Sequence, residues 1–227
     1  MQALYPAITL GKRATLTAVE LAAVIVLAPQ ENQGGALTPL GGDPAVCRMV
    51  RSLSRVVGQV LLVVDEAIAE RIDAVLAGLT VDILTVDGSA TRADCLALAG
   101  RALAEMRAGR RDVTHVLLAD PRHPLMAADM IDRVVAALAR GAELVVPVLP
   151  VTDTVKTVDA GGTITATVDR ATLRQLQYPR GMRVDRLADP VTVDSLAGAV
   201  TVEGDADAVS AQLPADAALL EAIIACR

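Results

Sequence analysis

The sequence predicts a single α/β domain in which helices flank a mostly parallel sheet and one β-arm protrudes. Two observations support this prediction: short Val-rich apolar runs alternate with segments of helical periodicity, and the runs themselves are almost continuously hydrophobic. Alternation of this kind favours a parallel sheet with helices on its faces, and continuous hydrophobicity is typical of strands buried on both sides. The 227 residues fit one large α/β domain.

The predicted strands and helices follow one another along the chain. Apolar runs predict strands at 22–28, 59–64, 81–86, 115–120 and 143–149, with 199–203 as a candidate sixth. Helical periodicity predicts helices over 43–57, 66–79, 90–108, 127–140 and 214–225. In the first helix we expect Asp43 as the N-cap and Pro44 at the first helical position, and Gly141 is expected to end the fourth.

A protruding arm is predicted from two Thr- and Val-rich stretches that flank the turn sequence Asp-Ala-Gly-Gly at 159–162. Turn residues between two such stretches predict a β-hairpin. We therefore expect an arm over residues 150–170 within a domain that spans 21–227. Residues 1–20 show no clear period, and we expect them to form a mobile N-terminal extension.

The composition argues against several classes of partner. The formal net charge is −6 without a basic cluster, so nucleic acid, which is bound mainly by phosphate neutralisation, is not expected. The longest apolar run, 21–28, is too short for a membrane span of about 20 residues. Residues 1–20 lack an apolar core of their own, so no signal peptide is expected. The 3 cysteines are too few for a disulfide framework, and we expect a cytoplasmic protein.

Ligands of an open parallel sheet collect at the carboxyl ends of its strands, and four predicted loops lie there. The first loop, 29–44, carries Pro29, Gly34 and Gly35 ahead of a helix. Glycines let backbone N–H groups approach phosphate closely, and a helix N-terminus favours anions, so these three residues are nucleotide-binding candidates. A Gly-rich surface loop without a ligand is the alternative interpretation.

The second and fourth loops carry weaker signals. Gly88 and Arg92 in the loop 86–94 are further nucleotide-binding candidates, and the alternative is an ordinary strand-to-helix turn with Arg92 in a solvated first helical turn. Asp205 in the loop 203–214 is a candidate carboxylate for a metal ion, while a turn role after Gly204 is the alternative.

The third loop, 119–124, holds the strongest catalytic candidate. Asp120 ends an apolar strand, where a carboxylate can hold Mg²⁺ that bridges phosphate oxygens. Arg122, two residues further, is positioned to reach a phosphate. The alternative for Asp120 is to cap the following turn, which is a frequent role of Asp before Pro.

The segment 147–183 carries three landmarks in order: Thr-Asp-Thr at 152–154, Asp-Arg at 169–170 and Gln-x-Pro-x-Gly at 177–181. Together they resemble the 2-C-methyl-D-erythritol 4-phosphate cytidylyltransferase family. The resemblance implies a nucleotidyltransferase-like, Rossmann-like fold and a homodimer whose arm reaches the partner's active site. It also implies that Thr154 and Arg170 hold the sugar phosphate across the dimer. A solvated hairpin whose charged residues protect its edges is the alternative.

The resemblance further implies the reaction: an oxygen of methylerythritol phosphate attacks the α-phosphorus of CTP and pyrophosphate leaves, with Mg²⁺ as the cofactor. Asp120 would place the metal, with Asp205 as a second carboxylate. Gly88, Arg92 and Arg122 would bind the nucleotide together with the first loop.

The chain departs from the family pattern where cations are needed. The family has an Arg and a Lys in the first loop, whereas residues 29–44 contain neither. Ser210 stands at a family lysine position, and His123 stands at a family arginine position. Loss of a single charge-stabilising donor typically costs about 10²–10³ in rate.

Three interpretations therefore stay open. The first is an active cytidylyltransferase. The second is a catalytically inactive relative that binds a phosphorylated metabolite or a protein partner. The third is a nucleotidyltransferase with another nucleotide or acceptor, in which Arg92, Arg122 or Lys12 replaces the missing cations.

Overall fold

The computed structural model describes residues 20–31, 33–108, 113–187 and 195–227. The predicted N-terminal extension, including Lys12, lies outside these residues apart from Glu20. In the described part of the chain, no helix combines the length and the hydrophobicity needed to cross a membrane.

The centre of the molecule is an 8-stranded sheet in the order β10-β7-β11-β6-β1-β4-β5, with β12 paired to β7. Its strands are β1 (Leu21–Leu27), β4 (Gln59–Asp65), β5 (Asp82–Val86), β6 (His115–Ala119), β7 (Leu144–Pro150), β10 (Arg174–Leu176), β11 (Arg180–Arg183) and β12 (Val200–Glu203). Strand β1 runs parallel to β4 and β6, β4 is parallel to β5, and β12 is parallel to β7. Strands β10 and β11 are antiparallel to their neighbours. The predicted mostly parallel sheet is confirmed, including the candidate sixth strand.

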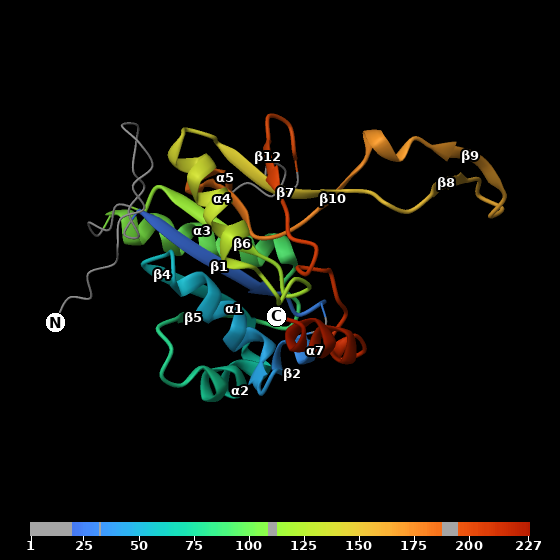
Figure 1. The fold of residues 1–227 in the computed structure, drawn as a ribbon. Coiled ribbons are helices and arrows are strands. Elements are labelled where there is room, and N and C mark those ends of the chain that lie inside the picture. Colours follow the sequence, from blue (N-terminus) through green and yellow to red (C-terminus); the bar gives the residue numbers. More distant parts are fainter. Residues whose placement is uncertain (1–19, 32, 109–112, 188–194) are drawn as a thin grey trace.

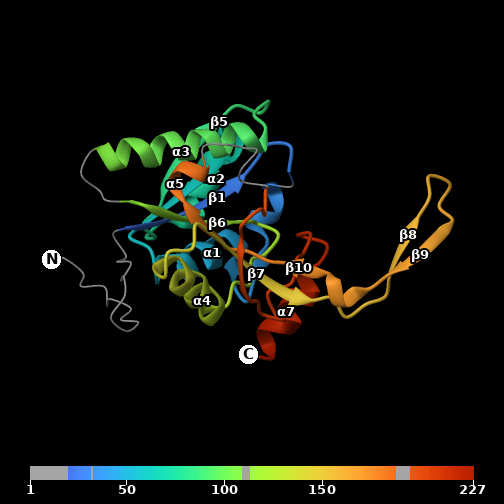
Figure 2. The same ribbon diagram turned by 90° about the horizontal axis from the view of Figure 1, so that it is seen from above.

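Helices cover both faces of this sheet. They are α1 (Ala45–Ser54), α2 (Glu66–Leu76), α3 (Arg92–Ala108), α4 (Ala128–Ala139), α5 (Val184–Leu187) and α7 (Ala217–Ala225), together with the 3₁₀ helices η1 (Gln33–Leu37) and η2 (Arg170–Thr172). Helices α3 and α5 lie on one face and α1 and α4 on the other (Figure 2). As predicted, strands and helices alternate along most of the chain, and the helices form layers on the two faces of the sheet (Figure 1).

Burial on both faces explains the continuous hydrophobicity of the strands. Every residue of β1 is buried. Leu21 and Ile25 pack into the core that contains α1 and α4, whereas Val24 packs into the core that contains α3. Since successive side chains of a strand point to opposite faces, a strand between two helical layers needs apolar residues at every position.

The start of α1 differs from the prediction. The helix begins at Ala45, and Asp43–Pro44 instead forms a short strand, β3, paired with β2 (Pro39–Leu40). The Asp43 carboxylate pairs with Arg51 and does not cap the helix. The prediction of Asp43 as N-cap was wrong because the backbone of this residue is engaged in the hairpin.

The end of α4 is as predicted. Gly141 adopts φ +94°, and its N–H donates to the carbonyl of Leu138 at 2.8 Å. Left-handed backbone just after a helix is favourable for glycine because it has no Cβ.

The predicted arm is a β-hairpin that extends away from the body of the molecule (Figure 1). Strands β8 (Val155–Val158) and β9 (Ile164–Val168) pair with each other and form a sheet separate from the central one. Asp159 closes the turn by accepting hydrogen bonds from the N–H groups of Gly161 and Thr163, both at 2.9 Å.

Strand β11 was not predicted, and it depends on a close contact with α4. A Cβ added at Gly181 would lie 2.6 Å from Val134 Cγ1 and 2.8 Å from Leu138 Cδ1. The absence of a side chain therefore lets β11 lie between β6 and β7 beneath the helix. A four-residue segment with two arginines gives no hydrophobic strand signal in the sequence.

Replacing Gly181 with Ala should push β11 and α4 apart. We expect the free energy of unfolding to fall by about 1–3 kcal/mol, as for other overpacked cores. Denaturant unfolding measures this loss. Gly88→Ala is the matched control, because its Cβ would lie 3.5 Å from an Asp65 oxygen, an ordinary contact. Equal stability of the two variants would contradict the packing role of Gly181.

Candidate functional site

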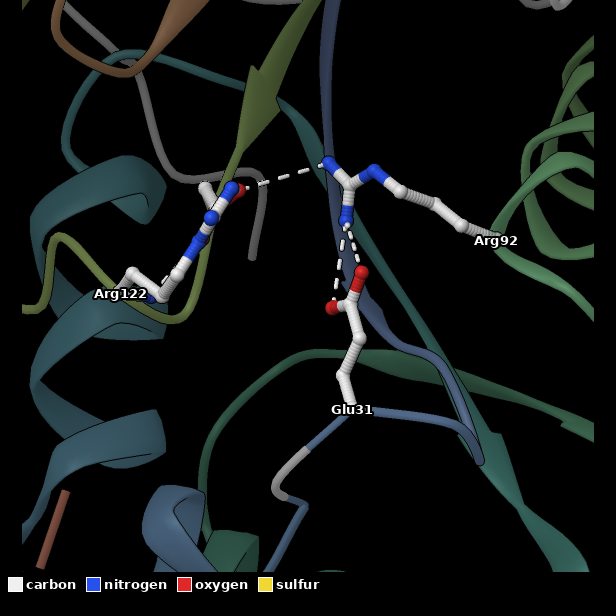
Figure 3. A network of polar contacts seen from close by, with 4 residues as sticks. Glu31, Arg92 and Arg122 are labelled. Carbon is white, nitrogen blue, oxygen red and sulfur yellow. Dashed lines mark hydrogen bonds and ion pairs between the residues drawn. The ribbon is translucent and has the colours of Figure 1, made fainter. Parts of the chain in front are cut away.

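Charged side chains from three separate loops converge at the carboxyl edge of the sheet. Glu31 follows β1, Arg92 is the first residue of α3, and Asp120 and Arg122 follow β6. Figure 3 shows the guanidinium of Arg92 between Glu31 and the carboxylate next to Arg122. The parallel strands bring these loops together because their carboxyl ends lie at the same edge.

Asp120 is fully buried and both of its carboxylate oxygens are hydrogen-bonded. Oδ1 accepts from the backbone N–H of Arg122 at 2.9 Å and from its Nε at 3.0 Å. Oδ2 accepts from Nη2 of Arg122 at 2.8 Å. Burial by itself would raise the pKa of Asp120, but the hydrogen bonds from Arg122 and the charge of Arg92 outweigh it and lower the pKa. Asp120 is therefore ionised at neutral pH.

Arg92 links two carboxylates. Its Nη2 lies 3.6 Å from Oδ2 of Asp120, and its Nη1 lies 3.5 Å from Glu31 Oε1. Arg122 is more accessible, since 59% of its side chain is exposed while Asp120 beneath it has none. The Nε and Nη2 edge of Arg122 is engaged by the buried carboxylate, which leaves the other N–H groups of this exposed guanidinium for a phosphate oxygen.

A cavity of about 270 Å³ lies beside this network. It is lined by Glu31, Gly35, Ala36, Pro121, Arg122, Ala211, Gln212 and Leu213. Two of the predicted nucleotide-binding residues, Gly35 and Arg122, thus face one cavity.

The predicted first-loop residues differ in their surroundings. Gly35 is buried, and a Cβ there would lie 2.7 Å from the carbonyl oxygen of Leu213. Packing against the segment before α7 therefore accounts for this glycine. Gly34 is exposed and Pro29 is half-buried. Gly88 is exposed after β5, where its nearest neighbour is Asp65.

The side chain of Asp205 stabilises a turn. Its Oδ1 accepts from the N–H of Asp207 at 2.7 Å and lies 3.8 Å from Nη2 of Arg227. The turn interpretation of this residue is therefore realised, and a role in metal binding stays a prediction.

Gln177 is a structural residue that the sequence presented only as a landmark. Its side chain is fully buried and donates to the carbonyls of Asp205 and Ala208 at 2.7 and 2.9 Å. Its Oε1 accepts from the N–H of Asp205 at 2.9 Å. A Cβ on Gly204 would lie 2.1 Å from that oxygen. The buried side chain of Gln177 therefore requires a glycine at position 204.

The predicted sugar-phosphate residues lie on the arm. Thr154 and Arg170 are exposed, and Arg170 donates to the carbonyl of Thr152. The hairpin that they flank projects away from the central sheet (Figure 1). Within one chain these residues are therefore not gathered with the carboxyl-edge site.

A second group lies near Asp120, and sequence reasoning pointed to His123 in it but missed Tyr178 and Arg180. The guanidinium carbon of Arg180 lies 4.5 Å from the ring centroid of Tyr178, and the His123 ring lies 5.3 Å from that ring. Burial lowers the pKa of His123 to about 4, so this side chain is neutral at physiological pH. Arg180 occupies the variable position before the glycine of Gln-x-Pro-x-Gly, where the motif itself gives no signal.

The side chains near Asp120 can be compared with what a divalent cation requires of its ligands. Among the described residues, no group of three His, Cys, Asp or Glu side chains is arranged around a common point for a metal. Asp120 contributes one carboxylate, now occupied by Arg122. Mg²⁺ is usually held by one or two carboxylates together with substrate phosphates. The described residues therefore do not form a metal site by themselves, and a role of Asp120 as ligand of a cation that arrives with a nucleotide stays a prediction.

The chain matches the family described as 2-C-methyl-D-erythritol 4-phosphate cytidylyltransferase over residues 28–224.

The chain belongs to this family.

The resemblance predicted from the landmarks in 147–183 is thereby confirmed, and with it the nucleotidyltransferase-like fold. Enzymes of the family generally use divalent cations.

Relatives named 2-C-methyl-D-erythritol 4-phosphate cytidylyltransferase include a Saccharopolyspora erythraea protein. It is 38% identical over 175 residues, which cover 72% of this chain and 76% of the relative. A Frankia casuarinae protein of the same name is 36% identical over 185 residues, 78% of this chain and 66% of the relative. The chain thus spans slightly less than two thirds of the length of some relatives it matches.

Solved structures show the same fold. A crystal structure of 4-diphosphocytidyl-2C-methyl-D-erythritol synthase superposes with a TM-score of 0.73 at 22% identity, covering 90% of this chain and 98% of the other. The 2-C-methyl-D-erythritol 4-phosphate cytidylyltransferase from Thermus thermophilus gives a TM-score of 0.69 at 24% identity, covering 88% of this chain and 97% of the other.

The neutral, buried His123 should make the protein sensitive to mild acid. Its pKa is about 4 in the folded state against an ordinary 6.5, so the unfolded chain binds the proton first as pH falls. We expect the free energy of unfolding to be unaffected by this group above pH 6.5 and to fall by up to about 3 kcal/mol as pH drops towards 4.

Urea unfolding at several pH values, with His123→Asn as the variant, measures this effect. The variant should lose that part of the pH dependence. His115→Asn is the matched control and should keep it, although burial also lowers the pKa of His115. Identical pH profiles for the wild type and His123→Asn would contradict the assignment.

Proposed function

We propose that the protein is a cytoplasmic cytidylyltransferase of isoprenoid precursor synthesis, which transfers the cytidylyl group of CTP to 2-C-methyl-D-erythritol 4-phosphate. The observation that carries this proposal is the network in which buried Asp120 holds the exposed side chain of Arg122 beside a cavity, in a chain of this family. A fixed guanidinium with N–H groups left over next to a cavity suits a nucleotide phosphate.

The reaction places modest demands on proton transfer. An oxygen of the acceptor phosphate forms the new bond to the α-phosphorus, and the bond from that phosphorus to the bridging oxygen breaks, so that its electron pair leaves with pyrophosphate. Because the acceptor oxygen is already ionised, no strong general base is needed. The chain's main contribution is therefore to position the phosphates and to stabilise the charge that develops on them.

In this proposal each charged residue has its own role. Arg122 donates hydrogen bonds to a phosphate oxygen from the mouth of the cavity, and Arg92 keeps Asp120 ionised from the other side. Gly34, Gly35 and Gly88, with Pro29, shape the backbone that surrounds the nucleotide. Mg²⁺, when it is bound with the nucleotide, would neutralise part of the phosphate charge, with Asp120 as its ligand and Asp205 as a second carboxylate.

We assign the acceptor phosphate to Thr154 and Arg170 of a second copy of the chain. The hairpin pairs only with itself among the described strands, and Val158 and Ile164 on it are 59% and 63% exposed. Exposed apolar residues on a projecting hairpin favour contact with another molecule. A homodimer that exchanges arms would place each hairpin near the partner's site.

A second candidate function is binding without turnover. It is favoured by the composition of the first loop, since residues 29–44 contain no Arg or Lys. Such a relative would bind a phosphorylated metabolite or a protein partner through the same network. A nucleotidyltransferase with another nucleotide or acceptor, using Arg92 and Arg122 in place of the missing cations, is the remaining alternative.

Turnover separates these functions. With CTP, methylerythritol phosphate and Mg²⁺, the wild type should release pyrophosphate, and Asp120→Ala should lower kcat by at least about 10²-fold, because it frees both arginines from their anchor. A coupled pyrophosphate assay measures this. Asp132→Ala, an exposed aspartate on α4, is the control and should keep full activity. Absence of release by the folded wild type would leave binding without turnover as the better account.

The arm should determine the oligomeric state. We expect a dimer at micromolar concentration in equilibrium sedimentation, and Val158→Asp with Ile164→Asp should shift it towards monomer by about tenfold or more in dissociation constant, because charges would enter the buried contact. Leu219→Asp is the matched control, since Leu219 is 53% exposed on α7, away from the arm. A wild-type monomer would contradict the arm exchange.

A further inference from the structure

Arg180 is a buried cation without a counter-charge. Only 8% of the residue is exposed, and its Nε has no hydrogen-bond partner. No ion pair joins Arg180 to another described residue, and its guanidinium carbon lies 4.5 Å from the centroid of the Tyr178 ring. A buried charge is costly when it is not paired, and an aromatic face compensates for it less than a carboxylate would. This arrangement points to a missing anion.

The pairing of the strands places this cation near the carboxyl-edge site. Strand β11 is antiparallel to β6, with Arg180 opposite Leu118. Continuing that register by two residues brings Tyr178 opposite Asp120. The guanidinium of Arg180 lies over the Tyr178 ring, so its side chain reaches towards the edge of the sheet where Asp120 lies. Burial raises the pKa of Tyr178, and the charges of Arg180 and Asp120 also act on it, as expected for neighbours.

His123 completes the group. It is 5% exposed, and neither ring nitrogen has a hydrogen-bond partner. A neutral imidazole has one N–H donor, which here is buried and unused. Two polar side chains thus lie unpartnered against the same ring, and each needs a hydrogen-bond acceptor.

The charge balance of the cluster favours an anionic ligand. Arg92 and Arg122 are matched by Glu31 and Asp120 through ion pairs. Arg180 adds one positive charge that no described side chain balances. A phosphate oxygen would balance this charge, and a guanidinium offers planar donors suited to it.

We propose that Arg180 and His123 form an anion subsite beside Asp120 that takes a phosphate oxygen of a nucleotide or of a phosphorylated acceptor. In this subsite Arg180 supplies, from β11, the positive charge that position 123 lacks in this chain. The chemical class of the ligand rests on the proposed function, whereas the inference of an anion rests on the unpartnered Nε of Arg180 and the unpartnered ring nitrogens of His123.

Isothermal titration calorimetry with CTP, methylerythritol phosphate and pyrophosphate tests this subsite. Arg180→Gln should weaken binding of at least one of these compounds by about tenfold or more, since hydrogen bonds to charged groups are strong. The compound whose binding weakens identifies the phosphate that occupies the subsite. Arg183→Gln removes the same charge from the exposed end of β11, where Arg183 pairs with Asp185, and should leave the affinities unchanged.

Melting temperature separates ligand binding from a structural role. Removal of an unpaired buried charge should leave the melting temperature of the ligand-free Arg180→Gln variant unchanged or raised. A lower melting temperature with wild-type affinities would overturn the proposal and assign Arg180 to packing against Tyr178.

A relocated charge provides the rescue experiment. Adding His123→Arg to Arg180→Gln should recover most of the lost affinity, because the cation then enters the same cluster from the loop after β6. Wild-type affinity of Arg180→Gln for all three compounds, or no binding of any of them by the wild type, would overturn the subsite. The subsite and the proposed reaction can be tested independently. Binding that depends on Arg180, in a protein that releases no pyrophosphate, would support the subsite and contradict cytidylyl transfer.

Discussion

The burial of the Asp120 carboxylate is the constraint on which the carboxyl edge of the sheet depends. A buried ionised group must be paired and hydrogen-bonded, and Arg122 supplies this pairing from the same loop. Arg92 approaches from the start of α3 and connects the carboxylate to Glu31 after β1. Three loops that are distant in the sequence are thereby held in one arrangement by charge neutralisation at a single point.

This arrangement reconciles family membership with a first loop that lacks cations. Arg122 lies in the β6–α4 connection, Arg92 at the start of α3 and Arg180 on β11, whereas residues 29–44 contain no Arg or Lys. Electrostatic stabilisation depends on where a charge lies in space and not on which loop provides it. A shared fold does not require that the same loop supplies the same charged residues in every member.

The sequence predicted well where one local signal decides the structure. Periodicity located the buried strands and the helices, Gly141 located the end of α4, and the turn at 159–162 located the arm. Prediction from the sequence failed where a tertiary contact determines the local structure. Asp43 looks like an N-cap, but its backbone is used by the hairpin of β2 and β3. Strand β11 has no apolar pattern and depends on Gly181 fitting beneath α4.

By itself the sequence determined the α/β order, the hairpin arm and the candidacy of Asp120, because strand periodicity, turn chemistry and a carboxylate at a strand end are local properties. Only the tertiary structure decided that Arg122 and Arg92 share Asp120, that Gln177 explains Gly204, and that Arg180 is buried without a counter-charge over Tyr178. Pairing of buried charges depends on distances between strands that are neighbours in space but not in the chain, and those distances arise only when the sheet is assembled.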